Sequence, residues 1–106
     1  MEENKEYEVI YAVVNNGFAD HAMIAARRAG AKGGTILRAR GSSNEKMDKR
    51  YGLAITPEKE VLMILTSVDI KDAIMDAIYQ ADMNENNERA LIFSMPVAST
   101  VGFKHE

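Results

Sequence analysis

Apolar positions along the chain form four short runs and two longer periodic segments. The short runs are rich in β-branched and aromatic residues, a composition typical of strands. They predict strands at Tyr7–Val14, Thr35–Ala39, Val61–Val68 and Ala90–Met95. The periodic segments place small or aliphatic side chains three and four residues apart, which is typical of helices that pack on one face. They predict helices over Ala19–Ala31 and Asp69–Ala81.

The segments between these elements carry capping and turn residues. Asp20 and Asp69 lie where a carboxylate can cap or charge the N-terminus of each predicted helix. Gly33–Gly34 is expected to end the first helix. Polar turns or loops are expected at Asn15–Gly17, Thr56–Lys59 and Asp82–Arg89.

The first and third predicted strands are apolar on both faces, with Glu8 as the exception in the first. Such strands are usually central in a sheet that is covered on both sides. The order of strands and helices matches two interleaved βαβ units. We therefore expect an α+β, ferredoxin-like βαββαβ sandwich with an antiparallel four-stranded sheet. Helices would cover one face, and partner subunits of a closed homo-oligomer would cover the other.

The composition indicates a single domain over residues 1–106. A net charge of −3 argues against a general nucleic-acid binder. The chain has no cysteine and only two histidines, which excludes disulfides and argues against a histidine-rich metal site. No apolar run approaches the roughly 20 residues of a transmembrane helix. The polar N-terminus is unlike a signal peptide, so we expect a cytoplasmic protein without direct membrane insertion.

The polar loop Gly41–Tyr51 interrupts the hydrophobic pattern in mid-chain. Arg38 and Arg40 precede it and share one face of their strand, because side chains alternate along a strand. Together with the backbone amides of Gly41–Ser43, they predict an anion-binding corner. The alternative is a solvated edge strand whose arginines block aggregation. The charged residues of the loop likewise indicate either a docking loop or a solvated surface.

Catalytic arrangements are not visible in the sequence. His21 lies in the first turn of a helix, and no Ser-His-Asp or Cys-His set can be assembled around it. Asp20 and His21 alone are too few ligands for a metal site. We therefore expect no enzyme activity, no catalytic residues and no bound metal.

Four short motifs between residues 31 and 97 carry a resemblance to a known family. They are Gly33-Gly34-Thr35, Arg40-Gly41, Pro57–Glu60 before an aliphatic strand, and Ile92–Val97. In order and spacing they resemble the nitrogen regulatory P-II family and its P-II-like relatives. The resemblance implies a homotrimer with ligand clefts between subunits. It also implies a signal-transduction role in nitrogen utilization, in which a long loop (the T-loop, about 41–56 here) docks on transporters, enzymes or transcription factors.

The resemblance also implies site residues. An adenine nucleotide, ATP or ADP, would contact Thr35, Arg38, Arg40, Gly41, Ser42, Ser43, Lys59, Arg89, Ala90 and Lys104. A protein target such as a membrane transporter would contact Lys46, Lys49, Arg50 and Tyr51.

The chain departs from the P-II pattern where the family binds phosphate. Asn84–Arg89 replaces the family's glycine-rich loop, and Leu91 stands where the family has a lysine. The mid-chain loop is also several residues shorter. Three alternatives follow: a metal-binding trimer of the divalent-cation-tolerance type, a P-II fold that has lost nucleotide binding and acts only in protein interaction, and an enzyme on the same scaffold.

Overall fold

The computed structural model describes residues 6–41, 47–48, 53–54, 58–86 and 90–103. Its main sheet is antiparallel, with the order β2-β5-β1-β6. The strands are β1 (Tyr7–Asn15), β2 (Thr35–Arg40), β5 (Glu58–Ser67) and β6 (Leu91–Pro96). The short strands β3 (Met47–Asp48) and β4 (Leu53–Ala54) pair with each other in a separate two-stranded sheet. β1 and β5 are central in the main sheet, as their two apolar faces predicted.

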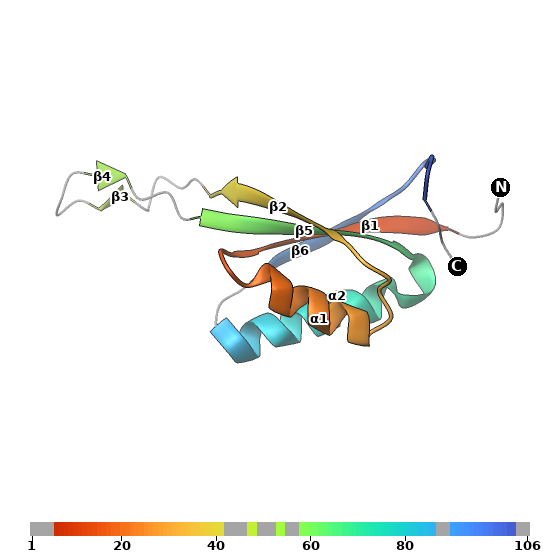
Figure 1. Ribbon diagram of the computed structural model, residues 1–106, viewed down its shortest axis with the longest axis horizontal. Helices are drawn as coiled ribbons and strands as arrows, with labels where there is room; N and C mark the ends of the chain where they lie inside the picture. Colours follow the sequence, from red (N-terminus) through yellow and green to blue (C-terminus); the bar gives the residue numbers. More distant parts are fainter. Residues whose placement is uncertain (1–5, 42–46, 49–52, 55–57, 87–89, 104–106) are drawn as a thin grey trace.

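Two helices, α1 (Ala19–Arg28) and α2 (Val68–Asn86), pack side by side on one face of this sheet (Figure 1). The order of elements and the one-sided helical layer confirm the predicted ferredoxin-like βαββαβ sandwich. Among the described residues, neither helix combines the length and hydropathy needed to cross a lipid bilayer.

The core lies between the sheet and the helices and is made of aliphatic and small side chains. The inward-facing residues of the central strands alternate with outward-facing ones, as the strand period requires. The core includes Ile10, Ala12, Val14, Leu62 and Ile64 of the strands, Ala22 and Ala26 of α1, and Ile74 and Ile78 of α2. Burying each large aliphatic side chain contributes roughly 1.5–3 kcal/mol. The alanines of α1 leave little side-chain bulk between that helix and the sheet.

The N-terminus of α1 is capped from a distant strand. Phe18 occupies the N-cap position and supplies no side-chain hydrogen bond. Instead, Oε1 of Glu60 in β5 accepts hydrogen bonds from the backbone N–H groups of Gly17 at 3.1 Å and Ala19 at 2.9 Å. Asp20 lies in the first turn, where its charge favours the helix dipole. The sequence pattern around Asp20 therefore located the helix start but not its capping residue.

The C-terminus of α1 differs from the prediction. The helix ends at Arg28, and Gly30 has a φ of 118°. The backbone N–H of Gly30 donates to the carbonyl of Arg27 and that of Ala31 to Ala26, each at 3.0 Å. This is the Schellman arrangement, in which a glycine at positive φ ends a helix. The expectation that the helix runs to Ala31 and ends at Gly33–Gly34 was therefore wrong.

Two polar segments predicted as turns or loops are partly regular structure. α2 continues to Asn86, so the first part of the predicted Asp82–Arg89 loop is helical. This part contains no glycine or proline that would stop a helix, and Asp82 is only 2% exposed. Glu58 and Lys59 belong to β5 rather than to a turn, because they pair with the end of β2.

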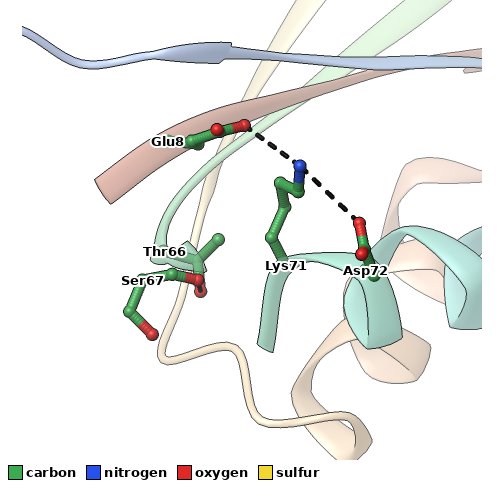
Figure 2. A network of polar contacts seen from close by, with 5 residues as sticks. All are labelled: Glu8, Thr66, Ser67, Lys71 and Asp72. Carbon is green, nitrogen blue, oxygen red and sulfur yellow. Dashed lines mark hydrogen bonds and ion pairs between the residues drawn. The ribbon is translucent and has the colours of Figure 1, made fainter. Parts of the chain in front are cut away.

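An ion-pair network connects the sheet to the start of α2 (Figure 2). Nζ of Lys71 lies 3.3 Å from Oε1 of Glu8 in β1 and 3.6 Å from Oδ1 of Asp72. The hydrogen bond to Glu8 raises the pKa of Lys71 above its ordinary value, and the negative charges of Glu8 and Asp72 act in the same direction. Glu8 breaks the apolar pattern of β1, and its carboxylate is used to hold α2 against that strand.

Candidate functional site

The sheet face away from the helices is mainly apolar, and no helix of the described chain covers it (Figure 1). We call it the open face. The strand register places on it Val9, Tyr11 and Val13 of β1, Val61, Met63 and Leu65 of β5, Leu37 of β2, and Leu91, Phe93 and Met95 of β6. Several of these side chains are strongly exposed, including Leu91 at 62% and Leu37 at 45%. Contiguous apolar surface of this kind marks an interaction site.

Two pairs of aromatic side chains pack against each other on the open face. Tyr11 and Phe93 are cross-strand partners whose rings stack with centroids 5.3 Å apart. Tyr7 and Phe103 meet edge to face with centroids 5.1 Å apart. The backbone N–H of Val97 donates to the carbonyl of Tyr7 at 3.1 Å. The C-terminal segment, residues 97–103, therefore turns back and packs on the start of β1.

A pocket of about 490 Å³ opens on the open face. Its lining consists of Val9, Lys32, Gly33, Gly34, Thr35, Met63, Leu65 and Phe103. Most of the lining surface is apolar, and Thr35 and Lys32 are the described lining residues with polar or charged side chains. Its volume lies within the range of small-molecule sites.

The two glycines of the pocket have different roles. A Cβ on Gly34 would lie 2.9 Å from the carbonyl oxygen of Met63 and 3.0 Å from Cγ1 of Ile64. Gly34 is therefore required by the close approach of its backbone to β5. A Cβ on Gly33 would meet nothing within 4 Å. A side chain can therefore be introduced at this lining position without a clash at its Cβ.

The structure separates the predicted ligand residues of β2. Thr35 pairs with Met63 and lies on the open face, where it lines the pocket. Arg38 and Arg40 lie on the opposite side of the strand, in register with Glu60 and Glu58. Each arginine therefore has a carboxylate as its cross-strand neighbour, an arrangement that stabilises a sheet without any ligand.

Lys59 shares the open face with Thr35, at a different place on the sheet. It pairs with Asn15 and Ala39, and its Nζ donates a hydrogen bond to Oδ1 of Asn15 at 2.6 Å. Four strand positions separate Lys59 from Met63, the partner of Thr35, which corresponds to roughly 13 Å. Lys59 is therefore distant from the pocket within one chain.

The remaining predicted site residues are described in part. Gly41 directly follows β2, and Ala90 directly precedes β6, where it packs against the core. The other predicted residues lie outside the described part of the chain; they are Ser42, Ser43, Lys46, Lys49, Arg50, Tyr51, Arg89 and Lys104.

Sequence reasoning missed Lys32 and Phe103 as lining residues. Lys32 directly precedes the Gly33–Gly34 pair, so its position beside a recognised motif was an available signal. Phe103 lies beyond the last strand, and nothing in the sequence placed its ring beside Val9 and Leu65. In the described part of the chain, no group of three or more histidine, cysteine or acidic residues is arranged to hold a metal ion.

Comparisons with known proteins identify the fold. No protein-family model matches the sequence. No curated protein matches it either. Among solved structures, Arabidopsis thaliana PII bound to citrate is similar, with a TM-score of 0.67, 17% sequence identity, and coverage of 87% of this chain and 78% of that chain.

A Bacillus cereus protein related to NIF3 is also similar, with a TM-score of 0.71 and 12% sequence identity. The alignment covers 92% of this chain and 27% of that one, so this chain spans about a quarter of the NIF3-related protein. At these identities the likeness concerns the fold alone. The fold of the chain is the ferredoxin-like fold of PII-type proteins, as its sequence motifs predicted.

Proposed function

We propose that the protein is a P-II-like signal-transduction regulator that senses a small molecule, an adenine nucleotide, in clefts between its subunits. The observation that carries the proposal is the pocket beside Thr35 on an apolar sheet face. The PII-type fold supports it, because the Arabidopsis protein of this fold holds citrate, a small anionic molecule. Fold likeness alone does not assign a function, so the argument rests on the pocket.

Copies of the same chain are the proposed cover of the open face, in a homotrimer. Exposed apolar side chains on β2 and β6, such as Leu37 and Leu91, are costly to leave in water. Burying them in a closed ring of identical subunits removes that cost. Because the pocket opens on the same face, assembly would place it at a subunit boundary.

The proposed output is the mid-chain loop, about residues 41–56. It follows β2 directly, so the strand that lines the pocket at Thr35 also leads into the loop at Gly41. Ligand binding would change the loop's affinity for a protein target, such as a transporter or a nitrogen-metabolism protein, through Lys46, Lys49, Arg50 and Tyr51. The size of that change is limited by the difference in ligand affinity between the two loop states.

Calorimetry and thermal shift with ATP, ADP and AMP test the proposal in three proteins: wild type, Gly33→Leu and Ser99→Leu. Leucine at Gly33 adds a bulky side chain to the pocket lining without a clash at its Cβ, whereas Ser99 is exposed and does not line the pocket. We expect a nucleotide to stabilise the wild type and Ser99→Leu but not Gly33→Leu, since a ligand that binds the folded state raises stability. Stabilisation of Gly33→Leu equal to that of the wild type contradicts the proposal.

A second candidate is a P-II fold that has lost nucleotide binding and acts only as a protein-interaction module. Two observations favour it: Arg38 and Arg40 face acidic neighbours on the side away from the pocket, and the glycine-free segment up to Asn86 is helical. A well-folded oligomer that binds none of the nucleotides would support this candidate. Capture of a partner by wild type, but not by Lys46→Ala/Arg50→Ala, would then establish it.

A further inference from the structure

The described residues that line the pocket include few charged side chains. Among the described lining residues, Lys32 is the only one with a charged side chain. It is exposed and lies just beyond the C-terminal turn of α1. The apolar side chains of Val9, Met63 and Leu65, with the ring of Phe103, make up most of the remaining lining. The described lining therefore offers an apolar region for a flat ring and, from Lys32, one cation for an anionic group.

Among the described residues, the two arginines predicted to hold phosphates are directed away from the pocket within one subunit. Arg38 and Arg40 lie on the helix side of β2, opposite Glu60 and Glu58. The segment Asn84–Asn86 continues α2 and has no glycine to bring backbone amides close to a phosphate. A second or third phosphate at this pocket therefore gains no cation from these residues.

From this arrangement we infer that the pocket binds a nucleoside monophosphate in preference to the di- and triphosphate. The base packs against Phe103 and the apolar residues of β1 and β5, and the phosphate pairs with the ammonium of Lys32. This inference rests on the proposed function and deepens it, because it names the ligand class and makes Lys32 and Phe103 the residues that determine specificity.

Calorimetry on the intact wild-type protein with adenosine, AMP and ATP tests the inference. We expect AMP to bind about tenfold more tightly than adenosine, and at least as tightly as ATP. Lys32→Gln should weaken AMP binding about tenfold while leaving adenosine binding unchanged. Arg28→Gln is the matched control, since Arg28 is an exposed cation in the last turn of α1 that does not line the pocket.

The ring contact is tested separately with Phe103→Leu, which keeps an apolar side chain but removes the aromatic surface. It should weaken adenosine and AMP by the same factor, because the base is common to both ligands. Unequal weakening would contradict the assignment of the base to Phe103.

Four further results would overturn the inference, and they differ in what they imply for the proposed function. The inference is contradicted if ATP binds tenfold more tightly than AMP. It is also contradicted if Lys32→Gln leaves AMP binding unchanged. In both cases the proposed function still stands, provided that Gly33→Leu abolishes binding. Lack of binding by adenosine, AMP and ATP in the folded wild-type protein contradicts both. AMP binding that survives Gly33→Leu places the site outside this pocket and also contradicts both.

Discussion

Glu60, in a central strand, accepts a hydrogen bond from the backbone N–H of Ala19, the first residue of α1, at 2.9 Å. The same carboxylate oxygen accepts the N–H of Gly17. The cap of this helix is thus a long-range contact between residues 41 positions apart. It couples the helix start to the sheet and leads to the first prediction.

Glu60→Ala should destabilise the protein by about 1 kcal/mol, within the 0.5–2 kcal/mol range for loss of an N-terminal cap. For a chain of this length, this corresponds to a fall of roughly 4–8 °C in the melting temperature. Glu58→Ala is the control, because Glu58 is exposed and makes no such cap. Equal destabilisation by the two variants in thermal melts would show that capping is not the role of Glu60.

Gly34→Ala should destabilise by about 1–3 kcal/mol, the usual cost of overpacking a core. The added Cβ would lie 2.9 Å from the carbonyl oxygen of Met63, a backbone atom that cannot easily shift. Gly33→Ala should stay close to the wild type, because its added Cβ meets no atom within 4 Å. Urea denaturation of both variants provides the measurement, and a reversed order would contradict the assigned roles.

The Lys71–Glu8 contact should give a pH-dependent contribution to stability (Figure 2). Because folding raises the pKa of Lys71 from 10.5, the contribution is fully present below pH 10.5 and is lost as the pH rises through the folded-state value. The free energy of unfolding of Lys71→Met should therefore lie below that of the wild type at neutral pH. The two proteins should converge as the pH rises through the folded-state pKa of Lys71.

A double-mutant cycle with Glu8→Gln isolates this pair. The coupling energy between positions 8 and 71 should be present at neutral pH and vanish at high pH. A coupling that persists unchanged at high pH would indicate packing of the lysine stem rather than its charge.

The proposed homotrimer predicts a specific response to a charge on the open face. Phe93→Glu places a carboxylate in the aromatic stack with Tyr11, and it should convert the assembly to monomers. Ile24→Glu is the matched control, because Ile24 is 48% exposed on α1 and lies away from this face. Light scattering after size-exclusion chromatography distinguishes the two. Dissociation by Ile24→Glu but not by Phe93→Glu would locate the interface on the helical layer instead.

The sequence predicted the fold because its strongest signal is local. Strands apolar on both faces are expected in the centre of a sheet, and both such strands are central here. Element ends were predicted less well. The sequence offers two glycine signals for the end of α1, and the helix ends with a Schellman turn at Gly30 rather than at the more conspicuous pair Gly33–Gly34. The polar residues at the end of α2 resembled a loop, although they continue the helix to Asn86.

The candidate site was predicted in part. Thr35 was identified by its motif, and the structure places it in the pocket lining. The alternation of side chains already implied that Arg38 and Arg40 face away from Thr35, and the register shows it. Lys32 and Phe103 were missed, since the pocket forms only when the C-terminal segment packs on β1, and no local pattern encodes that contact.

β2 pairs with only one other strand of the main sheet, β5. Displacing β2 therefore breaks one ladder of hydrogen bonds and leaves the β5–β1–β6 unit intact. Its six residues span roughly 20 Å from the pocket to the start of the mid-chain loop. β2 is thus an edge strand that can shift without disrupting the rest of the sheet. It joins the candidate ligand pocket at one end to the candidate docking segment at the other.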